Sequence, residues 1–451
     1  MLFYKNYVKI NFKIDFKIDK NKKFMSPSIA IGIFGIIIIL GFLGEILFQY
    51  TKLPSILFLM AAGLLLGPIY HLFNQDVFLS FAPYLSTLVL VLIMFQGGLE
   101  LNFLTVFKSS FVSMILLLSG LILSTVFVGV IFYIMGGADF IQSLMLGTIV
   151  SCSSSTVIIP LLPNINASEK SKTVIAIEST FNDAFAIILL IILISIAKHA
   201  SINMNYGKIA FQTAYSFGIS GLIATVLGIV WYMALKVLVK TKFAYGVTFA
   251  AMLVLVLIMH YVHGNGAIAI LVFGIIMGNE DLLNRFKINF FNMSIKNSVI
   301  KQFNHEFSFL IRTVFFVFLG VVVELANLNW EFFDRFFIII VLIILSRYIA
   351  VWIAFKLENN KKIKDAPPTP KEERFFMLSM IGRALATAIM AYMPLNEGIP
   401  GTSAFPEYAF LVIITTNILL TVGVFIYSRK AKNAAPQAID ANLSKTPETN
   451  P

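Results

Sequence analysis

The sequence predicts an all-α polytopic membrane protein with about thirteen transmembrane helices. Of the 451 residues, 58% are hydrophobic and only 13% are charged, whereas soluble domains carry roughly a quarter charged residues. Apolar runs long enough to cross about 30 Å of hydrocarbon recur from residue 28 to residue 428. These runs are continuous rather than alternating, so they indicate helices and not the strands of a barrel.

The predicted spans are apolar runs separated by short polar or charged connections. All but the ninth are long enough to cross the bilayer as helices, and the ninth is short enough to suggest a broken or re-entrant element. In order, the spans cover 28–49, 53–72, 82–101, 110–135, 139–162, 171–197, 208–238, 243–262, 265–279, 303–326, 332–356, 374–395 and 406–428. We therefore expect a basic N-terminal tail at 1–27, a transmembrane domain at 28–428 and a short polar C-terminal tail at 429–451.

The charge pattern excludes a nucleic-acid-binding function despite a net charge of +11. Basic residues gather in the tails and in the connections near 236–242, 285–301 and 356–374, and the positive-inside rule expects such residues between spans on the cytoplasmic side. These connections and the tail that begins at Arg429 fall on one side of the membrane in this span count. That side is predicted to be cytoplasmic, with the C-terminal tail on it. With thirteen spans the lysine-rich N-terminal tail lies on the opposite side, against the same rule, so either one span is miscounted or the C-terminal connections decide the orientation.

No cofactor and no enzymatic activity are expected. The single cysteine, Cys152, excludes an intramolecular disulfide and a cysteine-based metal cluster. The sequence contains no phosphate-binding loop, no zinc-binding HExxH and no nucleotide-binding glycine fingerprint. Energy for any transport would then come from an ion gradient.

A weak internal repeat divides the chain into two halves. Residues 62–67, AGLLLG, resemble residues 273–278, FGIIMG, and residues 95–101, FQGGLEL, resemble residues 318–325, FLGVVVEL. The two matches occur in the same order in both halves. Duplicated halves are typical of transporters whose binding site lies at the interface of the repeats.

Two spans look interrupted, one in each half. Residues 150–156 place five hydroxyls and a thiol in a row ahead of Pro160, and residues 380–384 place Gly382 and Arg383 in the middle of a span. A break in a membrane helix frees backbone groups that then need a cavity, an ion or a partner. Paired breaks at corresponding positions indicate a transport site.

The sixth span carries two carboxylates, Glu178 and Asp183. They are five residues apart, roughly 140° around a helix, so they can hold different partners. With Asn182 and Ser179, Asp183 forms a set of hard oxygen donors suited to Na⁺ or Li⁺, and the same carboxylate can bind a proton instead. The alternative reading for Asp183 is a permanent ion pair with a buried arginine.

Five further polar residues lie within or near apolar spans, and Glu178 is considered with them. We expect Glu178 to pair with a buried arginine, because Arg347 and Arg383 sit inside spans and need counter-charges. Gln96 lies mid-span and could line the ion path. Glu100 and Arg312 are closer to span ends, where interfacial positions are expected.

At this point the residues resemble a known family. Residues 178–184, ESTFNDA, resemble the Asn-Asp motif of monovalent cation/proton antiporters, in particular the NhaP-type sodium/proton exchangers. Supporting motifs follow in the same order at 64–68, 95–100, 315–320 and 382–384.

The resemblance implies an NhaA-like fold with inverted repeats, a dimerisation domain and a six-helix core in which two unwound helices cross. It implies that Asp183 is the carboxylate that exchanges ion and proton, that Asn182 is its companion, and that Glu178 pairs with Arg347. It also places Arg383 on the second unwound helix. An Asn-Asp pair is associated with electroneutral exchange of one cation for one proton.

One departure concerns the first unwound segment. NhaP-type members usually carry Thr-Asp-Pro there, whereas this chain has serines at 153–155. This serine run resembles the potassium/proton branch of the superfamily more closely. Ser153 and Ser154 therefore become candidate ion ligands beside Ser179 and Gln96, and the missing aspartate removes an expected partner of Arg383.

The leading expectation is a homodimeric Na⁺(Li⁺)/H⁺ antiporter of the cell membrane, with Na⁺ bound at Asp183 and the lipid bilayer as its surroundings. A K⁺/H⁺ antiporter is the close alternative. A passive cation channel or a membrane sensor on the same scaffold is the alternative from a different class.

Overall fold

The structure, a computed structural model, is a bundle of helices in two groups. It describes residues 27–51, 53–70, 75–101, 111–200, 206–238, 244–279, 299–324, 329–360 and 373–443. The predicted N-terminal tail, apart from its last residue, lies outside these ranges, as do most of the basic connections used to assign sidedness. Every regular element within the described ranges is helical.

The helices follow the predicted spans closely. They are α1 (Pro27–Thr51), α2 (Ser55–Leu64) with the π-helical turn η1 (Leu65–Ile69), α3 (Gln75–Glu100), α5 (Phe111–Ile134), α6 (Phe140–Ile149), α7 (Ser155–Leu161) with the 3-10 turn η2 (Leu162–Asn164), α8 (Glu169–Ala200), α9 (Tyr206–Leu238), α10 (Ala244–Tyr261), α11 (Gly266–Gly278), α13 (Val299–Val322), α14 (Trp330–Asn360), α15 (Arg374–Ser379), α16 (Leu385–Asn396) and α17 (Phe405–Leu443). Each of the thirteen predicted spans coincides with one helix or one interrupted pair. Within the described residues, eight helices are long and apolar enough by themselves to cross a membrane.

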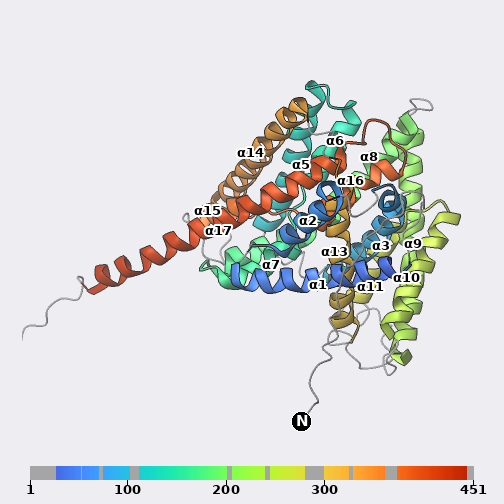
Figure 1. Cartoon of the computed structure of the whole chain (residues 1–451), viewed down its shortest axis with the longest axis horizontal. Coiled ribbons are helices and arrows are strands. Elements are labelled where there is room, and N and C mark those ends of the chain that lie inside the picture. The colour runs from blue at the N-terminus through green and yellow to red at the C-terminus, as the bar shows by residue number, and fades with distance from the viewer. Residues whose placement is uncertain are drawn as a thin grey trace, which may run out of the picture.

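Two details differ from the sequence expectation. The ninth span, α11, is a single uninterrupted helix, whose start is capped because the side chain of Asn265 accepts a hydrogen bond from the amide of Ile268. Helix α17 continues to Leu443 instead of ending at residue 428, and Figure 1 shows it extending beyond the rest of the bundle.

The two interrupted spans cross each other. Helix α6 is separated from α7 by the non-helical residues 150–154, and α15 from α16 by 380–384. At the crossing, the amide of Ser154 donates a 2.8 Å hydrogen bond to the carbonyl of Gly382. A Cβ atom on Gly382 would lie 2.7 Å from Cδ1 of Leu420 on α17, so the segment packs closely against that helix. The predicted pair of unwound, crossing helices is confirmed.

The helices divide into a core group, α5–α8 and α14–α17, and a scaffold group, α1–α3, α9–α11 and α13. In the core group α5 packs against both α6 and α14, and in the scaffold group α3 packs against α11 and α2 against α13. Figure 1 shows α5, α14 and α17 toward one side of the molecule and α9 and α10 at the other. The crossing lies within the core group.

The two halves of the repeat pack reciprocally through glycines. A Cβ atom on Gly63 would lie 2.2 Å from the carbonyl oxygen of Val317, and one on Gly98 would lie 2.4 Å from that of Leu271. The first motif of each half therefore contacts the second motif of the other half. Such mutual contact is expected of two copies related by a two-fold axis, and small residues permit the close approach of the backbones.

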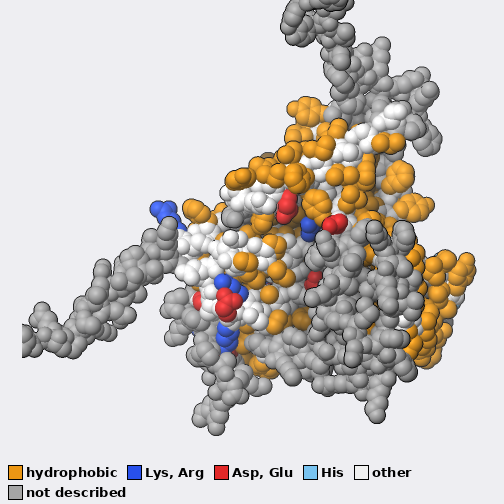
Figure 2. All heavy atoms as spheres, turned by 90° about the horizontal axis from the view of Figure 1, so that it is seen from below, with side chains coloured by type: hydrophobic (Ala, Val, Ile, Leu, Met, Phe, Trp, Pro, Cys, Tyr) orange, Lys and Arg blue, Asp and Glu red, His pale blue; other side chains and the backbone are white. Residues whose placement is uncertain are grey.

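The surface is largely apolar. Large hydrophobic side chains such as Ile31, Phe211 and Phe425 are exposed, and Figure 2 shows apolar side chains over much of the described face, with charged ones confined to small groups. Extensive exposed apolar surface is abnormal for a soluble monomer and suits contact with lipid.

Candidate functional site

Helix α8 passes beside the crossing and brings its polar residues to it. The helix is unbroken over 32 residues, and two of its hydroxyls near the crossing bond to its own backbone. Ser179 and Thr180 both donate to the carbonyl of Ala176, at 3.2 and 2.8 Å. The remaining polar side chains of this part of α8 reach beyond their own helix. Glu178 and Asn182 contact the first unwound segment, and Asp183 lines a cavity beside it.

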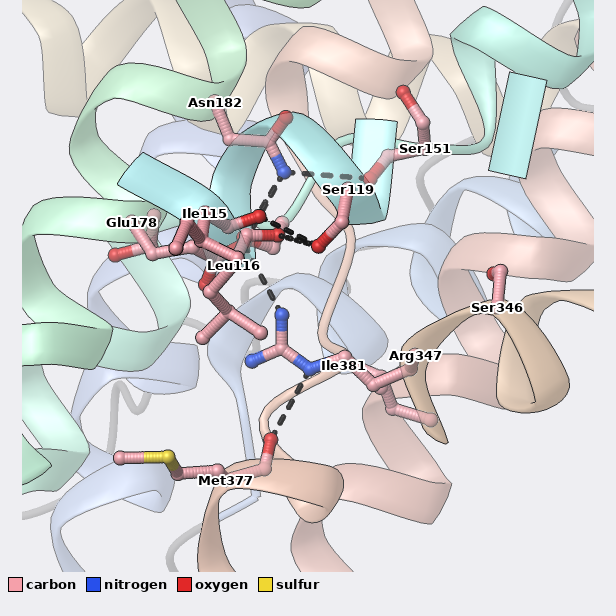
Figure 3. Close-up of polar contacts among 12 residues, drawn as sticks. Ile115, Leu116, Ser119, Ser151, Glu178, Asn182, Ser346, Arg347, Met377 and Ile381 are labelled. Atoms are coloured by element: carbon pink, nitrogen blue, oxygen red, sulfur yellow. Dashed lines mark hydrogen bonds and ion pairs between the residues drawn. The ribbon is translucent and has the colours of Figure 1, made fainter. Parts of the chain in front are cut away.

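Glu178 is held in a buried ion pair with Arg347 of α14. Its Oε1 lies 3.1 Å from Nη1 of Arg347, and the two side chains are 1% and 7% exposed. Ser153 donates a 2.8 Å hydrogen bond to the same oxygen, and Nε of Arg347 donates to the carbonyl of Met377 at 3.1 Å. Figure 3 shows Arg347 between α8 and the end of α15.

Asn182 ties α8 to the first unwound segment. Its Nδ2 donates to the carbonyl of Ser151 at 3.4 Å, to Oγ of Ser153 at 3.3 Å and to Oε1 of Glu178 at 3.4 Å, and Figure 3 shows the amide turned toward Ser151. Ser153 therefore lies with Glu178 and Asn182. It is not one of the residues that line the cavity at Asp183.

Arg383 contacts backbone carbonyls at the crossing. Its Nε donates to the carbonyl of Val150 at 3.0 Å, and its Nη1 donates to that of Ile381. Val150 directly follows α6, where the helix dipole places partial negative charge. The buried guanidinium thus binds carbonyl groups just beyond the ends of the two interrupted helices. Asn417 of α17 in turn donates a 2.6 Å hydrogen bond to the backbone carbonyl of Arg383.

Asp183 lies at a cavity between the core and scaffold groups, which we call the inner cavity. Its Oδ1 is buried and has no hydrogen-bond partner. The inner cavity has a volume of about 40 Å³, room for a few water molecules or a dehydrated ion. Its polar lining consists of Gln96, Glu100, Ser154, Ser155, Thr156, Thr180, Asp183, Ser308 and Arg312.

A larger outer cavity continues from the inner one. The two share Gln96, Glu100, Ser155, Thr156 and Arg312. The outer cavity has a volume of about 310 Å³ and reaches Glu45, Pro54 and Pro160. Pro160 lies at the end of α7, close to the start of α8, so the path to Asp183 leads from the face of the molecule where α8 begins.

Apart from Arg383, which lies at the crossing, the sequence-predicted site residues separate into three places. Ser154, Gln96 and Asp183 line the inner cavity, Ser153 and Asn182 join the Glu178 ion pair, and Ser179 bonds to its own helix.

Sequence reasoning missed six further polar residues that line the inner cavity: Ser155, Thr156, Thr180, Ser308, Glu100 and Arg312. Glu100 and Arg312 were expected at the membrane interface, but in the structure both line the inner and the outer cavity. The four-residue spacing of Gln96 and Glu100 on one helix could have indicated a shared face.

Comparison with known proteins identifies relatives along most of the chain. The family model described as "Sodium/hydrogen exchanger, transmembrane" matches residues 35–429. A K(+)/H(+) antiporter NhaP2 of Shewanella baltica is 24% identical over 392 residues, covering 85% of this chain and 63% of its own length. A probable Na(+)/H(+) antiporter 2 of Methanocaldococcus jannaschii is 21% identical over 431 residues, covering 89% of this chain and 97% of its own length.

The fold also matches a solved structure. The sodium proton antiporter MjNhaP1 from Methanocaldococcus jannaschii aligns with a TM-score of 0.67 at 19% sequence identity, covering 90% of this chain and 98% of that protein. Apolar helices and relatives together make the chain a multi-pass membrane protein. Because the family model covers well over half of the residues, the chain belongs to the transmembrane sodium/hydrogen exchanger family.

Proposed function

We propose that the protein exchanges a monovalent cation for protons across the cell membrane, with Asp183 as the exchanging carboxylate. The observation that carries this proposal is the buried, unpartnered Oδ1 of Asp183 at the end of a cavity of ionic size. A buried carboxylate without a cationic partner in a membrane protein is costly and is expected to be functional. A cation and a proton would compete for it, so the half-saturating cation concentration should rise as the pH falls.

The neighbouring charges favour electroneutral exchange of one cation for one proton. Glu178 is paired with Arg347, which leaves Asp183 as the α8 carboxylate without a cationic partner at the crossing. One carboxylate carries one charge in either direction. Asn182 would hold the first unwound segment against α8 and so keep the site in shape.

We infer the choice of cation from the oxygen atoms that line the inner cavity. Carboxylate, amide and hydroxyl oxygens suit Na⁺ or Li⁺, which are the substrates we favour. A K⁺/H⁺ exchange is the second candidate, because serines occupy 153–155 and because relatives of this chain are named for Na⁺ and for K⁺ alike. This chain spans about 63% of the length of the K(+)/H(+) antiporter NhaP2.

Transport would proceed by alternating access, the core group moving against the scaffold group. On the face where α8 begins, the cavities separate the two groups. Near the opposite face, hydrogen bonds join them: Asn396 of α16 donates to Ser86 of α3 at 2.9 Å, and the hydroxyls of Ser195 and Thr213 lie 2.9 Å apart. We place the open face and the C-terminal tail in the cytoplasm and assign dimer formation to the scaffold group.

Reconstitution in proteoliposomes tests the proposal. A pH-sensitive dye records exchange with Na⁺, Li⁺ or K⁺ across a pH series, and an imposed membrane potential should leave an electroneutral rate unchanged. Asp183→Asn should abolish exchange, whereas Asp139→Asn, a carboxylate at the start of α6 and outside both cavities, should not. Normal exchange by Asp183→Asn would refute the assignment, and current without coupled proton movement would indicate a channel.

A further inference from the structure

Three carboxylates mark the path from the outer cavity to the exchange site. Glu45 of α1 lines only the outer cavity, Asp183 lines only the inner cavity, and Glu100 of α3 lines both. Glu100 therefore occupies the junction through which an ion passes to reach Asp183. The carboxylates sit on three different helices that converge on one continuous space.

Glu100 also determines how Gln96 can act. Nε2 of Gln96 donates a 3.0 Å hydrogen bond to Oε1 of Glu100, one helical turn away on α3. Because the amide nitrogen is engaged with Glu100, the amide oxygen is left as the acceptor that Gln96 can offer to a cation in the inner cavity. A cation is coordinated by oxygen atoms and not by N–H groups. Gln96 can therefore act as a ligand only when its amide oxygen faces the ion, which is the orientation that Glu100 imposes.

Arg312 of α13 provides the opposing charge. It lines the same two cavities as Glu100. A guanidinium on the wall repels cations, and the carboxylates attract them, so the occupancy of the junction depends on the balance between the two. The wall as described carries three carboxylates and one guanidinium, an arrangement that attracts cations when the carboxylates are ionised.

We propose that Glu100 is the cation-recruiting residue of the exchange reaction: it draws the ion to the junction of the two cavities and orients the Gln96 amide oxygen toward it, while Arg312 limits how tightly the ion is held there. This inference rests on the proposed function and adds a residue that determines cation affinity. Glu100 lies where the ion enters the inner cavity, so its removal should act first on capture of the cation.

The test separates capture from turnover. Glu100→Gln removes the charge but keeps an oxygen that can accept from Gln96, and it should raise the half-saturating cation concentration about 3- to 10-fold, with the maximal rate within about twofold of wild type. Glu100→Asp should restore most of the affinity. Arg312→Gln should shift the concentration in the opposite direction. Glu45 lines only the outer cavity, so Glu45→Gln should shift the concentration less than Glu100→Gln.

The outcomes decide the inference separately from the function. An unchanged half-saturating concentration in Glu100→Gln, or a fall in maximal rate without a change in that concentration, overturns the role of Glu100. If wild-type protein exchanges no cation, the proposed function fails. In that case Na⁺ binding is measured as the rise in melting temperature on adding Na⁺. A smaller rise in Glu100→Gln than in wild type supports the inference, and equal rises overturn it.

Discussion

The buried ion pair between Glu178 and Arg347 should stabilise the core group strongly. Glu178→Gln keeps the size of the side chain but removes its charge, which leaves the guanidinium of Arg347, only 7% exposed, without a counter-charge. Removing one partner of a buried pair costs about 3–5 kcal/mol. Even at a few degrees per kcal/mol, the melting temperature should fall by on the order of 10 °C.

Two comparisons isolate the cause. Arg347→Met in the Glu178→Gln background removes the unpaired charge and should recover part of the loss, which a double-mutant cycle measures. The ion pair of Lys198 and Glu397 provides the matched control, because its side chains are 42% and 50% exposed. Glu397→Gln should cost less than about 1 kcal/mol, as for other exposed pairs.

Thermal unfolding of the purified protein in detergent, followed by tryptophan fluorescence, supplies these values. The reasoning fails if Glu178→Gln and Glu397→Gln lower the melting temperature equally. It also fails if the double variant is as unstable as the sum of its single changes, because the two charges would then act independently.

Two further predictions concern packing and conformational change. Gly98→Ala should destabilise the scaffold group by about 1–3 kcal/mol, because its Cβ would meet the carbonyl of Leu271, whereas Gly97→Ala, with no atom within 4 Å of its Cβ, should be nearly neutral; equal melting temperatures would contradict the close approach of α3 and α11. Asn396→Ala removes one hydrogen bond between the groups, worth about 0.5–1.5 kcal/mol, so hydrogen exchange in the adjoining parts of α3 and α16 should speed up about 2- to 10-fold; unchanged exchange would mean that this contact does not hold the face closed.

Much of the fold could be predicted from local sequence features. Apolar length alone located the spans, because a helix must be about 20 residues long to cross hydrocarbon. The interruptions at 150–156 and 380–384 were visible because hydroxyls, glycine and a charge are unusual in mid-span. The repeat was visible because residues such as Gly63 and Gly274 mark positions where backbones approach closely.

The assignment of ligands was less complete, for a geometric reason. Ser179 and Thr180 are neighbours about 100° apart on one helix, and only the rotation of α8 in the bundle decides that Thr180 lines the inner cavity. The partner of Arg383 was not predictable either. It is a set of backbone carbonyls, and every residue in the chain has one.

The sequence by itself determined the class of the protein, the position of its interrupted helices and the importance of the segment around Asp183, because these depend on composition and on order along the chain. The tertiary structure alone decided which polar residues share a cavity. Glu45, Glu100, Asp183 and Arg312 come from four helices far apart in the sequence. Their convergence depends on how the core and scaffold groups pack. No local sequence pattern encodes which residues of distant helices lie close together.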